Sequence, residues 1–428
     1  MTEKKNRPEK QGGMWSKPVS RRDLLKMAGV GGAGLLLGGL GTGGLLGAKG
    51  LLQENKASAQ SGDIVDFYGS HQAGITTPSQ DFICFASFDV TTKDASDVRE
   101  LFKKWTEAAA AITSGELIGT ANDNGNLPPS DTGEAAGLNP SRITITFGVG
   151  PSFFDDRFGL ASKRPAGFEP LPHFNGDALR EEWNGGDLGV QVCANDMQVA
   201  FHAIRNLARI ARGKAVLRWT QEGFQRTSGS DEAGATPRNL MGFKDGTGNP
   251  DIRDEQTMNE VVWAQSGDGA SWMAGGSYMV VRRIRIRVEV WDRSTLKDQE
   301  GTFGRHRDSG APIGSRGEFD KVDLNAKDEK GKPAIPMDSH VRLARGDGSL
   351  RILRRSYSYS SGLDKTTGQL DAGLLFISYQ RDIAKQFIPL QRKLATDRLN
   401  EYILHHGSAV FACFPGVRKG GYIGETLL

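Results

Sequence analysis

Two groups of polar residues in the second half of the chain have the types and spacing needed for chemistry on a bound group. The first is GFKDGTGNP at 242–250, in which three glycines and a proline turn the backbone sharply around Asp245. The second runs from His340 to the adjacent Arg354 and Arg355. A carboxylate can transfer protons, an imidazole can bind a metal ion, and a guanidinium can stabilise an anion.

Each group also has an ordinary structural explanation. The first can be a surface turn in which Asp245 makes a local Asx contact, and the second a solvated turn followed by a strand with exposed arginines. The segment lacks the GxGxxG and GK[ST] patterns, so it predicts neither a dinucleotide-binding loop nor a P-loop. The residue types alone leave both explanations open.

Three cysteines, Cys84, Cys193 and Cys413, allow at most one internal disulfide, so the chain is not a disulfide scaffold. Each lies in an apolar stretch, and no pair has the spacing of a metal knuckle. We expect all three to be small buried side chains.

Hydrophobic patterns predict the elements that must position these groups. Strands are expected at 81–90, 142–150, 189–194, 215–219, 279–291, 374–380 and 408–415, and helices at 95–113, 152–160, 196–211 and 384–396. Polar, Gly-rich loops are expected at 120–141, 221–256 and 301–347. Strands and helices interleave in a hairpin-compatible order in both halves, which predicts an α+β fold with antiparallel sheets and helices on one face of each.

The first 59 residues have the order of a signal peptide. A basic region containing Arg21 and Arg22 precedes an uncharged run at 27–48, and small residues at 57–59 follow as a cleavage site. The paired arginines predict export by the twin-arginine route, which carries folded proteins, often with a bound cofactor. These residues hold ten of the 54 Lys/Arg and four of the 51 Asp/Glu. The remainder is slightly acidic and gives no support for a nucleic-acid partner.

Several motifs resemble those of the dye-decolourising peroxidases, in the order in which that family has them. GFKDGTGNP resembles its GxxDG signature, and DSHVRLAR followed by ILRRSYSY resembles the segments with its axial His and distal Arg. Other stretches are similar to its exported, iron-uptake-associated branch: FYGSHQAGI, QVCANDMQVAFHAIRNLARIA, TFGRHRDSGAP and LDAGLLFISYQRD. The resemblance covers essentially all of the chain after the signal.

The resemblance implies a role for each matching residue. His340 is expected to be the axial ligand of a haem iron, with Asp382 as the acceptor that holds its imidazole. Asp245 is expected to be the distal acid/base, and Arg354 the distal cation. Asn249 is expected to orient the distal pocket, and the neighbouring Gly246 and Thr247 to contact the cofactor. His306 is the main rival for the axial ligand.

The resemblance further implies two ferredoxin-like halves that form a barrel-like α+β fold, at 60–235 and 236–428, with one haem b bound largely by the second. The expected reaction is oxidation of a dye or another reducing substrate by hydrogen peroxide. The expected location is the periplasm or the cell exterior. Iron-uptake components at the membrane and copies of the same chain are further partners that the resemblance allows.

Two other functions fit the same site. A deferrochelatase would remove iron from haem and leave the porphyrin intact, and would release a fluorescent free porphyrin. A non-catalytic haem carrier would bind haem through His340 and would be indifferent to the loss of Asp245 or Arg354. The presence of a distal acid and a distal cation argues against the carrier.

Overall fold

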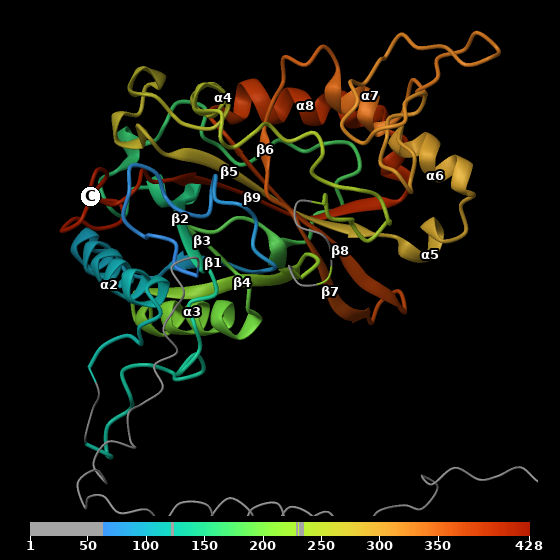
Figure 1. Cartoon of the computed structure of the whole chain (residues 1–428). Helices are drawn as coiled ribbons and strands as arrows, with labels where there is room; N and C mark the ends of the chain where they lie inside the picture. Colours follow the sequence, from blue (N-terminus) through green and yellow to red (C-terminus); the bar gives the residue numbers. More distant parts are fainter. Residues whose placement is uncertain (1–62, 121–123, 228–229, 231–234) are drawn as a thin grey trace, which may run out of the picture. The chain divides into compact units, whose positions relative to one another are not determined.

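The computed structural model describes residues 63–120, 124–227, 230 and 235–428 (Figure 1). The signal expected at 1–59 lies outside the described residues, so it stays a prediction. Within the described part of the chain, no helix combines the length and the apolar character needed to cross a membrane.

The first four strands and two helices have the order of a ferredoxin-like unit. They are β1 (Phe82–Val90), α2 (Ala95–Thr113), β2 (Thr144–Val149), β3 (Leu188–Ala194), α3 (Met197–Ile210) and β4 (Ala215–Phe224). The strands lie side by side as β2-β3-β1-β4, all antiparallel. Asp94 and Asp196 cap α2 and α3 through bonds from Ser96 N and Val199 N. This βαββαβ arrangement is the predicted ferredoxin-like half.

The second half repeats this order around five strands. They are β5 (Ser277–Ile286), β6 (Leu353–Arg354), β7 (Tyr357–Asp364), β8 (Gln369–Gln380) and β9 (Ile403–Cys413). The helices are α4 (Glu255–Val261), α5 (Val288–Trp291), α6 (Leu296–Phe303), α7 (His340–Arg345) and α8 (Ile388–Lys393). Strand β5 lies between β9 and β8. The other edge of β8 pairs with β7 along its first part and with β6 near its end.

Two contacts join the half-sheets into one closed antiparallel sheet. Gly148 of β2 pairs with Cys413 of β9, and Phe224 of β4 pairs with Ser358 of β7. Together with the β5–β8 pairing these contacts close the ring of strands. The predicted α+β fold with a barrel-like sheet is therefore confirmed, whereas the predicted boundary at 235/236 stays a prediction.

Apolar side chains fill both faces of this sheet. Phe85, Trp219, Met279, Tyr379 and Phe411 belong to the cluster inside the ring. On the outer face of the first half a second cluster packs beneath α2 and α3, which lie against that face in Figure 1. Cys84, Cys193 and Cys413 are all buried and unpaired, which confirms the prediction for them.

Several predicted elements differ in extent from the observed ones. The strand expected at 279–291 ends at Ile286, and Val288–Trp291 forms a helical turn, so the last part of that prediction is wrong. The helix expected at 152–160 is a short 3₁₀ turn, Pro151–Phe154. The helix expected at 384–396 is divided into a π-turn, Ile383–Phe387, α8, and a 3₁₀ turn, Leu394–Thr396. The loop expected at 301–347 contains α7.

Candidate active site

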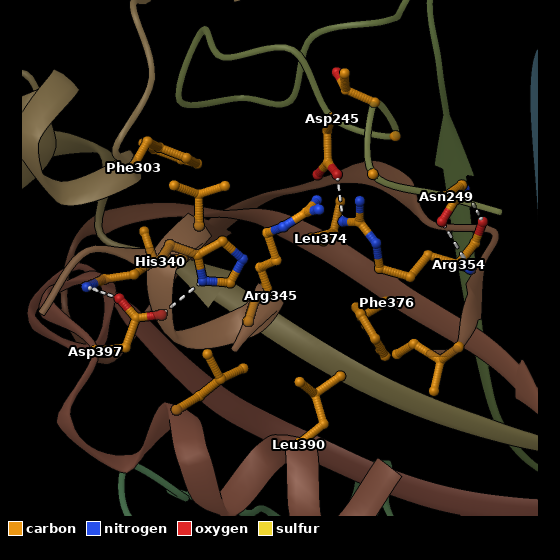
Figure 2. A pocket seen from close by; sticks show the side chains of 18 of the residues that line it. Asp245, Asn249, Phe303, His340, Arg345, Arg354, Leu374, Phe376, Leu390 and Asp397 are labelled. Atoms are coloured by element: carbon orange, nitrogen blue, oxygen red, sulfur yellow. Dashed lines mark hydrogen bonds and ion pairs between the residues drawn. The ribbon is translucent and has the colours of Figure 1, made fainter. Parts of the chain in front are cut away.

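A cavity of about 590 Å³ lies against the outer face of the second half-sheet (Figure 2). Alternate residues of three strands form its floor, whereas their neighbours face the interior of the ring. Helices α7 and α8 and the loop around Asp245 complete its walls. The apolar lining includes Ile284, Ile286, Phe303, Leu374, Phe376, Phe387, Leu390 and Ile403. This size is within the range of about 300–1,000 Å³ typical of ligand and cofactor pockets.

His340 is the first residue of α7 and faces the cavity. Its Nδ1 lies 2.6 Å from Oδ2 of Asp397, whose side chain is 2 % exposed. The other oxygen of Asp397 accepts a bond of 2.9 Å from Leu399 N, which fixes the carboxylate. Because a carboxylate accepts hydrogen bonds, the imidazole donates from Nδ1 and keeps the lone pair of Nε2 for a metal ion.

The prediction that Asp382 holds this imidazole is wrong. Asp382 caps the π-turn after β8 by accepting from Lys385 N at 3.0 Å, and its other oxygen pairs with Lys385 Nζ at 2.9 Å. Asp382 lies two residues after the end of β8, in the segment LDAGLLFISYQRD that resembles the family. Asp397 is 57 residues from His340, and no spacing rule connects the two.

His306, the rival ligand, is not among the residues that line the cavity. Its Nδ1 lies 3.2 Å from Glu300 Oε2, and its side chain is 41 % exposed. Among the described histidines, His340 and His405 line the cavity. The structure therefore favours His340 over His306 as the metal-binding imidazole.

Asp245 and Arg354 meet in the same cavity (Figure 2). Nη1 of Arg354 donates to Oδ1 of Asp245 at 2.7 Å. About a quarter of each side chain is exposed, 26 % for Arg354 and 22 % for Asp245. A half-buried acid in contact with a fixed cation can move a proton next to a group that stabilises negative charge.

The backbone of β6 decides which arginine of the adjacent pair faces the cavity. Arg354 lines the cavity, whereas Arg355 is 3 % exposed and donates to Thr77 O and Gln80 Oε1 on the other side of the sheet. Asn249 binds both backbone groups of Arg354, donating to its carbonyl at 2.8 Å and accepting from its N–H at 3.1 Å. Asn249 therefore positions Arg354.

The loop that carries Asp245 depends on its glycine and its neighbours. Gly246 has φ +121°, a conformation that other residues rarely adopt, and it lines the cavity together with Thr247. Asp245 N donates to Pro237 O at 2.8 Å, which holds the base of the turn. The structure thus brings five of the predicted site residues to one cavity with His340 and leaves Asp382 outside it.

The residues present fit a haem. The cavity offers one imidazole with a free Nε2, an apolar floor for a flat ring, and cations for two carboxylates. Among the described residues, neither Arg305 nor Arg345 forms an ion pair, and both line the cavity. Burial lowers the pKa of Arg305; the charge of Glu318 opposes this effect, and Arg354 and Arg345 lower the pKa further. Two guanidinium groups that have no salt-bridge partner within the described part of the chain suit the two propionates of haem.

Comparisons with known proteins show which proteins this chain is similar to. The family model described as Dyp-type peroxidase, N-terminal, matches residues 72–225, and the C-terminal model of the same family matches 236–418. A protein named Deferrochelatase from Escherichia coli O157:H7 is 42% identical over 371 residues, which are 85% of this chain and 86% of that protein. The DyP-type peroxidase of Streptomyces coelicolor is similar in structure, with a TM-score of 0.79 and 38% identity over 85% of this chain and 97% of that chain. Ferric DtpA from Streptomyces lividans has the same TM-score and identity, over 85% and 96%.

Proposed function

The chain belongs to the Dyp-type peroxidase family and is a haem peroxidase that uses hydrogen peroxide and a reducing substrate, and on this premise we propose which of its residues carry the reaction. We propose that His340 binds the iron, that Asp245 moves the proton of peroxide, and that Arg354 stabilises the charge that develops. The observation that carries this proposal is the 2.7 Å contact between Arg354 and Asp245 in the cavity that His340 lines.

When bound, haem supplies the iron at which peroxide reacts and stores the oxidising equivalents that the reducing substrate then removes. His340 would bind that iron through Nε2, because Asp397 occupies Nδ1. The apolar side chains of the cavity would hold the flat ring, and Arg305 and Arg345 would bind its carboxylates.

Asp245 accepts a proton from one oxygen of hydrogen peroxide and returns it to the oxygen that departs as water. A guanidinium has five N–H donors, so Arg354 can hold Asp245 through Nη1 and direct other donors at the breaking O–O bond. The overall reaction consumes one peroxide, two electrons from the reducing substrate and two protons, and gives two molecules of water.

The decisive experiment compares wild type with Asp245→Asn after each is loaded with haem. One equivalent of hydrogen peroxide should change the Soret band of wild type rapidly, and a reducing dye should reverse that change. Asp245→Asn should keep its haem but react about 10²–10⁴-fold more slowly. A Soret band in wild type that ignores peroxide would contradict the peroxidase assignment, and an equal rate in the variant would contradict the role of Asp245.

Removal of iron from haem is the second candidate function, because curated relatives at 40–42% identity are named Deferrochelatase. In that reaction the iron leaves, and two protons take its place on the ring nitrogens. Asp245, a carboxyl group that can transfer protons, lies in the same cavity. Porphyrin fluorescence that appears during incubation of the protein with haem, and only with the protein present, would support this function; its absence would contradict it.

We also propose export by the twin-arginine route to the periplasm or the cell exterior. The support is the order of basic residues, apolar run and small residues at 1–59. Cell fractionation of wild type and an Arg21→Lys, Arg22→Lys variant tests it: the variant should stay in the cytoplasm. We further propose that the protein binds iron-uptake components at the membrane or copies of the same chain. Co-purification from membranes tests the first interaction, and sedimentation analysis tests the second.

A further inference from the structure

Glu318 connects two loops beside the cavity. It lies in the segment that follows α6 and is 71 residues from Thr247 in sequence. Its Oε2 lies 2.5 Å from Lys244 Nζ, and its Oε1 accepts from Thr247 Oγ1 at 2.9 Å. Lys244 and Thr247 stand on either side of Asp245 and line the cavity with it. One carboxylate thus holds the turn that presents Asp245.

The environment of Glu318 keeps this carboxylate charged. Its side chain is 10 % exposed. Burial would raise its pKa, but hydrogen bonds from Lys244, Thr236 and Thr247 outweigh that effect and hold the pKa below its usual value. A half-buried ionised carboxylate with several donors keeps a defined position, because each donor constrains its rotamer.

The segment that carries Glu318 is itself fixed to the cavity wall. Nη1 of Arg305 donates to the carbonyls of Gly310 and Glu318 at 2.6 and 3.0 Å. A Cβ at Gly310 would meet Cδ of Lys244 at 2.7 Å, so the glycine lets the two loops approach. Arg238 further binds the carbonyls of Arg307 and Asp308 at 2.6 and 2.7 Å. The contact through Glu318 therefore joins two anchored segments.

Glu318 also balances charge near Asp245. The charged and titratable groups that line the cavity are Lys244, Arg282, Arg305, Arg345, Arg351 and Arg354 as cations, His340 and His405 as imidazoles, and Asp245, Asp251 and Asp397 as acids. Arg351 pairs with Glu260, and Asp251 pairs with Arg253. Lys244 has Glu318 as its ion-pair partner among the described residues. Without the charge of Glu318, an uncompensated ammonium would stand next to Asp245.

We propose that Glu318 is a positioning residue for the peroxide step: it fixes the Asp245 turn through Lys244 and Thr247, and it cancels the charge of Lys244. This inference rests on the proposed acid/base role of Asp245. Loss of the Glu318 charge should shift the pH dependence of the rate in one direction. Asp245 must be ionised to accept a proton, so the rate rises with pH through its acid limb. An uncompensated Lys244 favours the ionised carboxylate and moves that limb to lower pH.

The test measures the rate constant of the peroxide-induced Soret change against pH in four haem-loaded proteins. They are wild type, Glu318→Gln, the double variant Lys244→Gln with Glu318→Gln, and the control Glu300→Gln. Glu300 binds His306 Nδ1 and Arg307 N at 3.2 and 2.9 Å and so holds the same segment, but through neither Lys244 nor Thr247. Thermal unfolding and the Soret maximum before peroxide report folding and haem binding in each protein.

We expect Glu318→Gln to be about tenfold slower at neutral pH, since misplacement of a catalytic group by about 1 Å can cost ~10²-fold. Its acid limb should lie about one pH unit lower than that of wild type. The double variant should have the same acid limb as wild type, because it has lost both the charge of Lys244 and the charge of Glu318. Its rate should stay low, because the contacts that hold the Asp245 turn are still missing. Glu300→Gln should match wild type in both respects.

The outcomes separate this inference from the proposed function. A slow Glu318→Gln with an unmoved acid limb, and a lowered unfolding temperature shared with Glu300→Gln, would show a merely structural carboxylate and overturn the inference. Wild-type behaviour of Glu318→Gln alongside a slow Asp245→Asn would overturn it while leaving the role of Asp245 intact. If wild type itself did not respond to peroxide, the proposed function would fail first.

Discussion

A single carboxylate links the imidazole of His340, the proposed iron ligand, to the fold. Asp397 uses one oxygen to cap the turn Arg398–Glu401 and the other to hold His340, and it is almost fully buried. Close to this pair, Arg398 N donates to Asp338 O at 3.1 Å, which is a second contact between the two chain segments. A buried acceptor of this kind orients the imidazole and strengthens it as a ligand.

Asp397→Asn should weaken haem binding or activity by about 10–100-fold, because an amide accepts the Nδ1 proton less strongly. The Soret maximum should shift as the ligand weakens. Asp382→Asn is the matched control, since Asn can still cap the π-turn. Haem titration followed by absorption measures both variants. Equal affinities in the two would show that Asp397 does not support the ligand.

Substitution of the two adjacent arginines should affect different properties, the rate of the peroxide step for Arg354 and the stability of the fold for Arg355. Arg354→Met should slow the peroxide step, since the cavity loses the cation that contacts Asp245, and should change stability little. Arg355→Met should lower the free energy of unfolding by roughly 1–3 kcal/mol, because it leaves buried acceptors at Thr77 and Gln80 unpaired. Stopped-flow rates and urea unfolding of both variants check this difference. The reverse pattern would mean that Arg355 serves the cavity.

The sequence was sufficient to predict the residues that stand in motifs but not their partners. His340, Asp245, Arg354 and Asn249 came from segments whose order resembles one family, and all four line the cavity. Asp397 and Glu318 belong to no motif. They reach the site because turns far along the chain bring them there, and a lone acidic residue in a polar loop gives no signal of that.

At the scale of elements, period-2 alternation predicts a strand but not its end. The alternation of charged and apolar residues from Arg283 to Val290 continues without interruption, yet β5 ends at Ile286. Val288–Trp291 turns instead, because the Trp291 indole donates to Met241 O at 3.1 Å and the ring packs edge-on against Phe303 and Tyr402. Tertiary packing thus overrides the β propensity of Val288 and Val290.

The contact between the end of α6 and the start of α7 depends on one glycine. Gly304 ends α6 with φ +78°, and a Cβ there would meet Cγ1 of Val341 at 2.5 Å and Oγ of Ser339 at 3.0 Å. These two residues flank His340, so any side chain at 304 pushes the start of α7. The close approach of the backbones at this point is a requirement for the position of His340.

Gly304→Ala should therefore destabilise the fold by about 1–3 kcal/mol from backbone strain and should also weaken haem binding. Gly331→Ala is the control, since Gly331 has φ +73° but nothing within 4 Å of a Cβ. It should show the backbone strain without the effect on haem. Urea unfolding and haem titration measure the two effects. Equal haem affinity in both variants would show that α7 tolerates the shift.

At the scale of the whole molecule, local patterns predicted the two halves but not how they join. Strands interleaved with helices can be read in both halves, although the elements predicted for the second half leave out β6, β7 and the helices α4 to α7. The pairs Gly148–Cys413 and Phe224–Ser358 cannot be read in this way, because they join residues 265 and 134 positions apart, and the strands concerned pair at two positions and one position respectively. Closure depends on the twist of both half-sheets, and no periodicity in the sequence encodes it.

His405 lies where the two halves meet under the cavity. It is 4 % exposed, and its Nδ1 is 4.0 Å from Oδ1 of Asp177, a residue of the first half. Asp177 also pairs with the buried Arg282 of β5. Burial and the charge of Arg282 lower the pKa of His405 to about 4. The folded protein therefore keeps this imidazole neutral over a range in which the unfolded chain protonates it.

This difference makes stability depend on pH in one direction. Between the unfolded pKa of about 6.5 and the folded value of about 4, the unfolded chain binds more protons, so stability falls as pH falls. The full loss for one such group is about 3 kcal/mol. His405→Gln should flatten the fall in urea unfolding free energy between pH 6.5 and 4, even if it is less stable at pH 8. The exposed His173, replaced by Gln, should leave the slope of wild type unchanged. If the unfolding free energy of His405→Gln fell with pH as steeply as that of wild type, the loss of stability in acid would come from other groups and not from the buried His405.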